Sequence, residues 1–400
     1  MKQKVTGHRK IFFTVIASLL FLLTILLAPR LSAQEPPRHK VAVFTPLYLD
    51  SVFDARGNFR FEKTGARFAV PGMDFYYGVK AALDSLGKRG APLEIFLYDT
   101  RGKESINALL DKPEMEEVEM IIAHSNVTET RLLADAAQKK KIPFISATLP
   151  NDAGVNNNPY LVVLNTTLQS HVEGIYRFLQ RYHPTEKVIV FRKPGLQEDQ
   201  IKNHLVDFSK ATMASKLDIK FVDLNPNFSP RDLVAHLDSS RKNIVITGTL
   251  EESFGIRLAK QMAQLNRIYP SLVMGMPTWD NFNLAQKDLA TLEMIYSTPF
   301  FYNRGTPLET DLSSVFSNEM TVRPGEMFFR GYETMLRFGL LLLDTRKDIA
   351  SNLTRKGNVV LTPMDIQPVF KDRSAMTLDY FENKYLYFIK VIGGTKNVLY

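Results

Sequence analysis

The chain has 400 residues, 45% of them hydrophobic, and carries 50 Lys and Arg against 42 Asp and Glu. It contains no Cys, which excludes a disulfide framework, a thiol nucleophile, a Cys-based zinc site and lipidation of a Cys. Five basic residues of the first 33 account for most of the net charge of +8. The remaining 45 basic and 42 acidic residues give +3, which excludes the strongly basic surface typical of nucleic-acid-binding proteins.

The first 33 residues have the order of an export signal. Four basic side chains among the first ten residues precede an uncharged apolar run at 11–28, and Ala33 supplies the small residue of a cleavage site. The apolar run is also just long enough to span a bilayer, so an uncleaved anchor is the alternative. We therefore predict a periplasmic or otherwise extracytoplasmic protein that contacts a membrane only through residues 11–28, and only if they are retained.

Strand-like apolar runs alternate with helix-like stretches along the rest of the chain. The runs lie at 40–46, 93–99, 118–124, 142–148, 187–192, 217–223, 243–248 and 271–275. Between the first two runs, Phe75, Val79, Leu83 and Leu86 recur at helical spacing. This alternation predicts an α/β fold with parallel sheets that are covered by helices on both faces. Two series of four runs indicate two domains.

Two later stretches indicate that the chain crosses between these domains. Residues 156–167 read NNNPYLVVLNTT, an Asn-rich turn followed by an extended run, and residues 292–303 have the same character around Pro299. A strong helix is predicted at 326–345, and the strand-like run at 383–394 is expected to pair with 358–364. We therefore expect an N-lobe of 38–165 plus 297–345 and a C-lobe of 166–296 plus 346–400.

Residues 49–71, named here the Phe/Arg segment, interrupt the alternation. They separate the first predicted strand from the first helix and are long for such a connection. The segment contains four Phe and three Arg residues. It could pack on itself as a surface flap, or it could cover a cleft or contact a partner.

Polar residues gather where two neighbouring strands are predicted to end. Ser125, Asn126 and Thr128 follow one run, and Ser146 and Thr148 end the next. Ligands of open parallel sheets bind beyond the carboxyl ends of the strands, close to helix N-termini. We therefore expect both clusters at one sheet edge, where they could bind a small molecule. Each residue could instead cap a helix or end a strand.

Catalytic and metal-binding motifs are missing from the sequence. It contains no G-x-S-x-G, H-E-x-x-H, G-x-x-x-x-G-K-[ST] or post-strand G-x-G-x-x-G pattern. His124 lies at a predicted strand end, but no second His or carboxylate is spaced to share a metal with it. We expect no enzyme activity, no cofactor and no bound metal.

Four stretches resemble the type 1 periplasmic binding proteins, in a layout similar to that of the branched-chain amino-acid receptors of ABC importers. They are GVKAALDSLGKRGAPLEIFLYDTRG (78–102), IIAHSNVTETRLLADAAQKKKIPFISAT (121–148), NPYLVVLNTTLQSHVEGIYRFL (158–179) and FRGYETMLRFGLLLL (329–343). The resemblance covers most of the chain after the export signal. It is one of order and spacing rather than of strict motif, so it specifies the fold better than the ligand.

The resemblance implies two α/β lobes, each a parallel sheet with helices on both faces, that close about hinge strands on a solute. It implies ligand contacts from Tyr48, Ser125–Thr128 and Ser146–Leu149 in the N-lobe. In the C-lobe it implies loops near Arg192–Gly195, Thr249–Glu252 and Pro277–Asn281, with Thr249, Glu251, Trp279 and Asp280 as candidates. Trp279 could stack on a ring or pack in the core, and Glu251 could simply favour the start of a helix.

Two departures from the receptors bear on the ligand. The hydroxyl residue that meets the ligand carboxylate in the family falls on Val127, and the acidic residue that meets the ammonium falls on Pro277, with Asp280 nearby. We therefore predict a small polar solute, amino-acid-like or other, passed to transporter subunits or a sensor. The alternative is an envelope scaffold or regulator of cell-wall assembly that has the same fold, binds an envelope protein and takes no small ligand.

Overall fold

The computed structural model describes residues 38–61, 65–91, 93–345, 348–357, 359–372 and 375–399. The predicted export signal or anchor, residues 1–33, lies outside the described residues. Within the described ranges, no helix combines the length and the hydrophobicity that a bilayer crossing requires.

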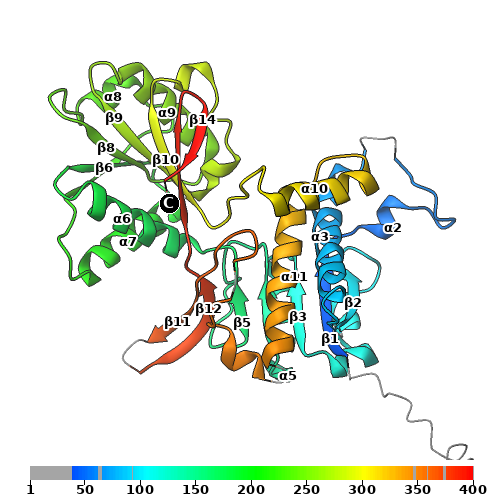
Figure 1. The fold of residues 1–400 in the computed structure, drawn as a ribbon. Helices are drawn as coiled ribbons and strands as arrows, with labels where there is room; N and C mark the ends of the chain where they lie inside the picture. Colours follow the sequence, from blue (N-terminus) through cyan, green and yellow to red (C-terminus); the bar gives the residue numbers. More distant parts are fainter. Residues whose placement is uncertain are drawn as a thin grey trace, which may run out of the picture. The chain divides into compact units, whose positions relative to one another are not determined.

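The N-lobe is built on a seven-stranded sheet (Figure 1). In sheet order its strands are Ile366–Asp372 (β11), Thr377–Asn383 (β12), Leu161–Val163 (β5), Phe144–Ser146 (β4), Met120–Ala123 (β3), His39–Thr45 (β1) and Leu93–Asp99 (β2). All neighbours pair in parallel except β11, which is antiparallel to β12. The central strands β3, β4 and β5 are buried throughout, as expected for a parallel sheet covered on both faces.

Helices cover both faces of this sheet. Val70–Gly87 (α3) and Glu326–Thr345 (α11) share one hydrophobic cluster, while Ile106–Leu110 (α4) and Val127–Lys140 (α5) contribute to the cluster on the other face. Pro307–Met320 (α10) packs against α3, with Tyr77 and Phe316 in edge-to-face contact at 5.8 Å between ring centroids. A short helix, Leu49–Val52 (α2), begins the Phe/Arg segment.

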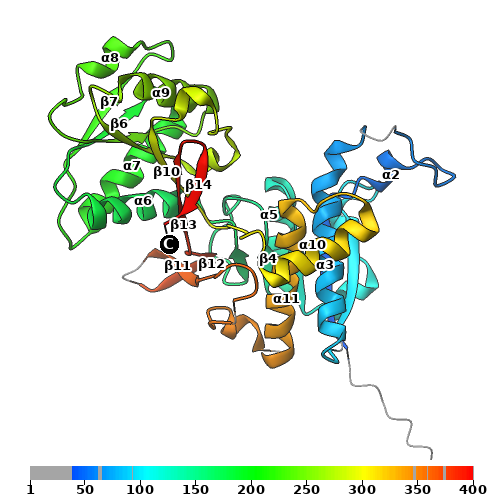
Figure 2. The same cartoon turned by 45° about the horizontal axis from the view of Figure 1, so that its top comes forward.

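The C-lobe is built on a second seven-stranded sheet. In sheet order its strands are Thr395–Val398 (β14), Tyr387–Ile392 (β13), Glu293–Thr298 (β10), Ser271–Gly275 (β9), Asn243–Thr247 (β8), Val188–Arg192 (β6) and Ile219–Asp223 (β7). Its helices are Leu168–Tyr182 (α6), Leu196–Ala211 (α7), Pro230–Val234 (α8) and Glu252–Leu265 (α9). Helices α6 and α7 lie on one face and α8 and α9 on the other (Figure 2). The predicted α/β architecture with two helix-covered sheets is confirmed.

Three connections join the lobes, one more than the sequence indicated. They run from β5 to α6, from β10 to α10 and from β12 to β13. The first and third contact each other, since the Thr166 hydroxyl donates to the Asn383 carbonyl at 2.7 Å. The buried Glu382 carboxylate accepts from the Thr167 N–H at 2.7 Å and from the Ser170 hydroxyl at 3.1 Å. This polar network fixes the end of β12 to the start of α6.

The strand pairing differs from the expected membership of residues 346–400 in the C-lobe. Strands β11 and β12 extend the N-lobe sheet beyond β5, so the chain returns to the C-lobe only with β13. The expected partnership of 383–394 with 358–364 is also wrong, because β13 pairs with β10 and β14. An isolated strand has the same alternating pattern at the edge of either sheet, so sequence periodicity cannot assign it to a lobe.

Candidate functional site

Three loops of the N-lobe meet at the carboxyl edge of its sheet. Phe44 of β1 is in register with Ala123 of β3, and Ala123 is in register with Ser146 of β4. The parallel alignment places the loops after these strands side by side, and they contain Tyr48, Ser125–Thr128 and Thr148. This register places the two polar clusters at one edge of the sheet, as predicted. Their contact with a ligand stays a prediction.

The loop after β3 uses most of its polar side chains to start α5. Asn126 is the N-cap: its side chain accepts from the Glu129 N–H at 2.9 Å, and Glu129 accepts in return from the Asn126 N–H at 3.0 Å. The Ser125 hydroxyl is buried and lies 2.8 Å from the Thr130 hydroxyl. Thr128 is exposed. Helix capping therefore accounts for Asn126, which is half-buried, and Thr128 is the most exposed side chain of this cluster.

The loop after β4 begins with two hydroxyl residues in different surroundings. Ser146 is completely buried, and its hydroxyl has no hydrogen-bond partner among the described residues. Thr148 is half-buried, and its carbonyl accepts from the Asn165 side chain at 2.7 Å. Of the two, Thr148 is the residue that a solute at this edge could contact.

Tyr48 has a left-handed backbone, with φ 57°, that is held by the carboxylate of Asp99. This carboxylate accepts from the N–H groups of Leu47, Tyr48 and Leu49 at 2.9, 3.1 and 2.8 Å. Arg101 lies over the Tyr48 ring, 5.9 Å from its centroid, and pairs with Glu129 at 3.1 Å. Asp99 and Arg101 thus join the loops after β1, β2 and β3, although the resemblance did not indicate Arg101.

His124 follows β3 and faces the α3–α11 side of the sheet. Its ring is edge-on to Phe75 at 5.6 Å, and burial, reinforced by the nearby Arg330 guanidinium, lowers the pKa of His124 to about 4. Arg330 donates to Glu326 at 2.9 Å and stacks 4.0 Å from the centroid of Phe300. His124 is therefore neutral near pH 7 and adds no charge to this edge.

The C-lobe candidates after β8 are bound to neighbouring side chains. The buried Thr249 hydroxyl donates to Glu198 at 2.7 Å. Glu251 forms an ion pair with Lys193, whose hydrogen bond, together with one from Ser253, lowers the pKa of Glu251. Glu198 was not indicated by the sequence. The sequence feature that could have indicated Glu198 is an acidic residue in the first turn of a helix that follows a strand. Many helices have such a residue, so the feature is not specific.

Trp279 and Asp280 follow β9 and have opposite environments. Trp279 is completely buried against Gly275, where a Cβ atom would come within 2.2 Å of the indole. This position agrees with core packing, the alternative to a ligand contact that the sequence left open for Trp279. Asp280 is partly exposed and accepts from the hydroxyls of Tyr296 at 2.9 Å and Thr298 at 3.1 Å.

The burial of Trp279, the single tryptophan of the chain, predicts how its fluorescence responds to a soluble quencher. We expect the folded protein to show blue-shifted emission that iodide barely quenches, because the indole has no solvent contact. Unfolding in guanidinium should red-shift the emission and restore quenching. Strong iodide quenching of the folded protein would contradict the core position of Trp279.

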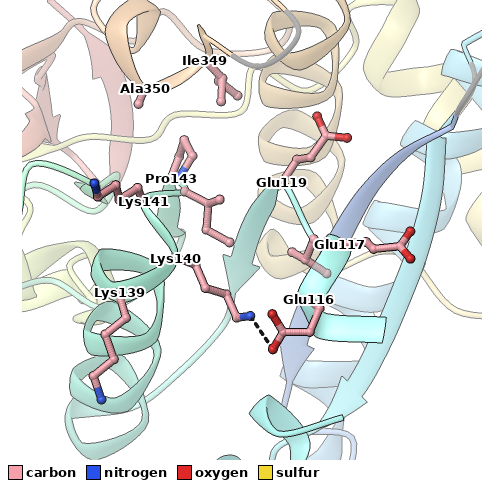
Figure 3. A pocket seen from close by; sticks show the side chains of 11 residues that line it. Glu116, Glu117, Glu119, Lys139, Lys140, Lys141, Pro143, Ile349 and Ala350 are labelled. Atoms are coloured by element: carbon pink, nitrogen blue, oxygen red, sulfur yellow. Dashed lines mark ion pairs between the residues drawn. The ribbon is translucent and has the colours of Figure 1, made fainter. Parts of the chain in front are cut away.

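A cavity of about 480 Å³ lies at the opposite, amino-terminal edge of the N-lobe sheet (Figure 3). Charged side chains from the segment before β3 and from the end of α5 line it. Lys140 pairs with Glu116 at 3.2 Å, and Glu117 and Glu119 pair with Lys40 and His39 outside the cavity lining. Ion pairing thus accounts for these carboxylates. Within the described ranges, no group of three or more His, Asp or Glu residues is arranged to hold a metal ion.

The fold and these edges define a two-lobed α/β binding protein, and the comparisons agree. A family model described as periplasmic binding protein matches residues 63–353, so the chain belongs to this family. Its members are binding proteins rather than enzymes, and membership implies an extracytoplasmic location. No curated protein matches the chain.

Solved structures of ABC-transporter proteins share the fold. A putative branched-chain amino-acid ABC transporter protein of Rhodospirillum rubrum is 15% identical, with a TM-score of 0.63, over 91% of this chain and 100% of that one. A periplasmic ligand-binding protein of Burkholderia xenovorans is 14% identical, with a TM-score of 0.61, over 91% and 95%. A substrate-binding protein of Desulfitobacterium hafniense in complex with Leu is 12% identical, with a TM-score of 0.56, over 91% and 100%.

Proposed function

We propose that this chain is an extracytoplasmic solute-binding protein that closes its two lobes on a small polar solute and passes it to an ABC-type importer or a sensor. Family membership carries this proposal, supported by polar loops at the strand carboxyl ends of both sheets. The solute binds without covalent chemistry, through hydrogen bonds and burial.

The charges at these edges favour a solute without net charge. Four ionic pairs are described there: Arg101 with Glu129, Arg330 with Glu326, Lys193 with Glu251 and Lys396 with Asp280. The Asp99 carboxylate is occupied by the backbone N–H groups of residues 47–49. A strongly charged solute would have to displace one of these partners. Neutral polar molecules and zwitterions such as amino acids are therefore the first solutes to test.

Thermal unfolding with added solutes tests the proposal. A panel of branched-chain and polar amino acids, short peptides, sugars and nucleobases should contain at least one compound that stabilises the protein, by about 2.7 kcal/mol at a concentration 100 times its Kd. We expect Thr148→Val to reduce this stabilisation by removing a hydroxyl at the proposed site. Thr354→Val, an exposed threonine elsewhere in the N-lobe, is the matched control. A panel without any stabilising solute would count against solute binding.

A second candidate function is an envelope scaffold that has the same fold and binds a protein. The exposed aromatic residues of the Phe/Arg segment favour it, because solute binding gives them no role. A flat response to the solute panel, together with a protein partner that binds this segment, would support the scaffold over the receptor.

A further inference from the structure

The Phe/Arg segment concentrates exposed apolar side chains on one part of the N-lobe. Single exposed hydrophobic residues are ordinary, but contiguous groups mark interaction sites. Five large hydrophobic residues between 49 and 70 are exposed: Leu49, Phe53, Phe59, Phe68 and Val70. Phe59, with half of its surface exposed, has the largest exposure of the three phenylalanines.

The aromatic rings of the segment form a continuous row. Phe53 contacts Phe59 at 6.0 Å between centroids, Phe59 contacts Phe61 at 6.0 Å, and Phe61 contacts Phe68 at 5.7 Å. Phe68 in turn meets Tyr48 at 5.0 Å, and all four contacts are edge-to-face. Each ring of the row therefore contacts a neighbouring ring, and none of them projects alone into solvent.

Backbone hydrogen bonds hold the first part of the row in a hairpin. Phe53 and Phe59 form a β-bridge, and the Arg60 N–H donates to the Val52 carbonyl at 2.9 Å. The turn between them is closed by the Asp54 carboxylate, which accepts from the Arg56 and Asn58 N–H groups at 2.8 Å. Gly57 supplies the positive φ, 79°, that the turn requires.

Polar groups hold the start of the segment to the carboxyl edge of the sheet. Asp99, at the end of β2, holds the backbone of residues 47–49, and Asp50 accepts from the Lys103 N–H at 2.8 Å. These polar contacts anchor the segment, and the exposed surfaces of Phe53, Phe59 and Phe68 remain open to a partner. The blue region around α2 in Figure 1 shows where the segment leaves the N-lobe.

Three arginine side chains place positive charge around the aromatic row. Arg56, Arg60 and Arg67 are exposed, and none of them forms an ion pair with the described part of the chain. Asp54, a carboxylate of the same segment, is occupied by the turn. Aromatic and arginine side chains are the residues enriched at the centres of protein interfaces.

We propose that the row Phe53–Phe59–Phe61–Phe68 with Arg56, Arg60 and Arg67 is a docking surface for a protein whose own surface has an apolar centre and a carboxylate rim. The guanidinium groups, which form no ion pair within the described residues, favour an acidic partner. They disfavour a second copy of this chain, because two such surfaces face to face would bring six arginines together. The rings contact one another edge-to-face in a row and none projects alone, which suits a protein surface better than insertion into a bilayer. This proposal does not depend on solute binding.

Site-specific photo-crosslinking in the native host tests the proposal with the full chain. A benzophenone amino acid at position 59 is expected to yield a defined protein adduct, and the same probe at Met213, a fully exposed apolar residue of the C-lobe, is expected not to yield it. The adduct protein is then purified and its affinity for the full chain measured. We expect Phe59→Ala and Arg60→Glu each to weaken binding by about tenfold or more and added salt to weaken it further, with Met213→Ala unchanged.

Several results would overturn the docking surface. One is that the probe at position 59 yields no protein adduct beyond that obtained with the probe at position 213. Another is that neither Phe59→Ala nor Arg60→Glu changes the affinity of the purified adduct protein for the full chain. Phe59-dependent sedimentation with phosphatidylglycerol vesicles would indicate a membrane instead, and a Phe59-dependent dimer would indicate self-association. Arg60→Glu keeps the ring row and so separates loss of contact from loss of structure. Both variants should retain any solute-induced stabilisation, so failure of solute binding and failure of docking give different results.

Discussion

Substitution of Gly331 by alanine is expected to lower the free energy of unfolding by about 3 kcal/mol or more. Helices α3 and α11 approach so closely that a Cβ atom at Gly331 would lie 2.2 Å from the Phe75 carbonyl oxygen. The contact is reciprocal, because a Cβ atom at Gly78 of α3 would lie 1.9 Å from the Phe328 carbonyl oxygen. Backbone cannot move aside as a flexible side chain can, so the helices would have to separate and open the N-lobe core.

Urea unfolding followed by circular dichroism measures this effect. The matched control is Gly87→Ala at the end of α3, where an added Cβ atom meets no atom within 4 Å. Since alanine favours helix over glycine by up to about 1 kcal/mol, the control should be neutral or slightly stabilising. If Gly331→Ala unfolds at the same urea concentration as the parent protein, the close helix contact described here is wrong.

Glu333 on α11 is expected to contribute a loss of stability of about 3 kcal/mol as the pH rises from 5 to 8, and the buried His124 and His171, whose pKa values burial lowers, contribute in the opposite direction. Burial raises the pKa of this carboxyl to about 7, although it accepts from the N–H and hydroxyl of Thr362 at 2.6 and 2.7 Å. A raised pKa means that the folded chain binds the proton more tightly than the unfolded chain. The stabilisation is therefore complete below the unfolded pKa, near 4.5, and lost as the pH passes 7.

Glu333→Gln isolates this contribution. Glutamine retains an acceptor for the Thr362 N–H and cannot ionise, so the stability of the variant relative to the parent should rise by about 3 kcal/mol between pH 5 and 8. Glu252→Gln, at an exposed position on α9, should keep the parent profile. Parallel profiles for the parent and Glu333→Gln would show that the carboxyl does not remain protonated in the folded protein. Denaturant midpoints at five pH values across this range are sufficient.

Much of the fold could be predicted because buried parallel strands and amphipathic helices leave strong periodic signals. Strands β3 and β8, for example, are continuous apolar runs bounded by polar loops. The two late strands β11 and β12 could not be assigned to the N-lobe, because what decides their place is the pairing of β12 with β5, 214 or more residues earlier in the chain. No local pattern encodes that partner.

The candidate site was predictable only in its location. Strand ends can be read from sequence, so the edge that carries Ser125 and Thr148 could be expected. Whether a polar side chain there is free depends on neighbours that come from elsewhere. Asn126 turns inward to cap α5 through Glu129, a pairing that the N-x-x-E spacing does signal. Trp279 is buried because Gly275 leaves room for the indole, and only coordinates reveal that fit.

The two final strand pairs have a consequence for how the chain matures. Strand β12 completes the N-lobe beside β5, and β13 completes the C-lobe beside β10, and both belong to the last 24 residues of the chain. A nascent polypeptide that emerges from its amino terminus therefore exposes an open sheet border in each lobe until residues 377–392 have emerged. Final assembly of both lobes consequently depends on this one short stretch, and a premature stop before residue 377 would impair the two together.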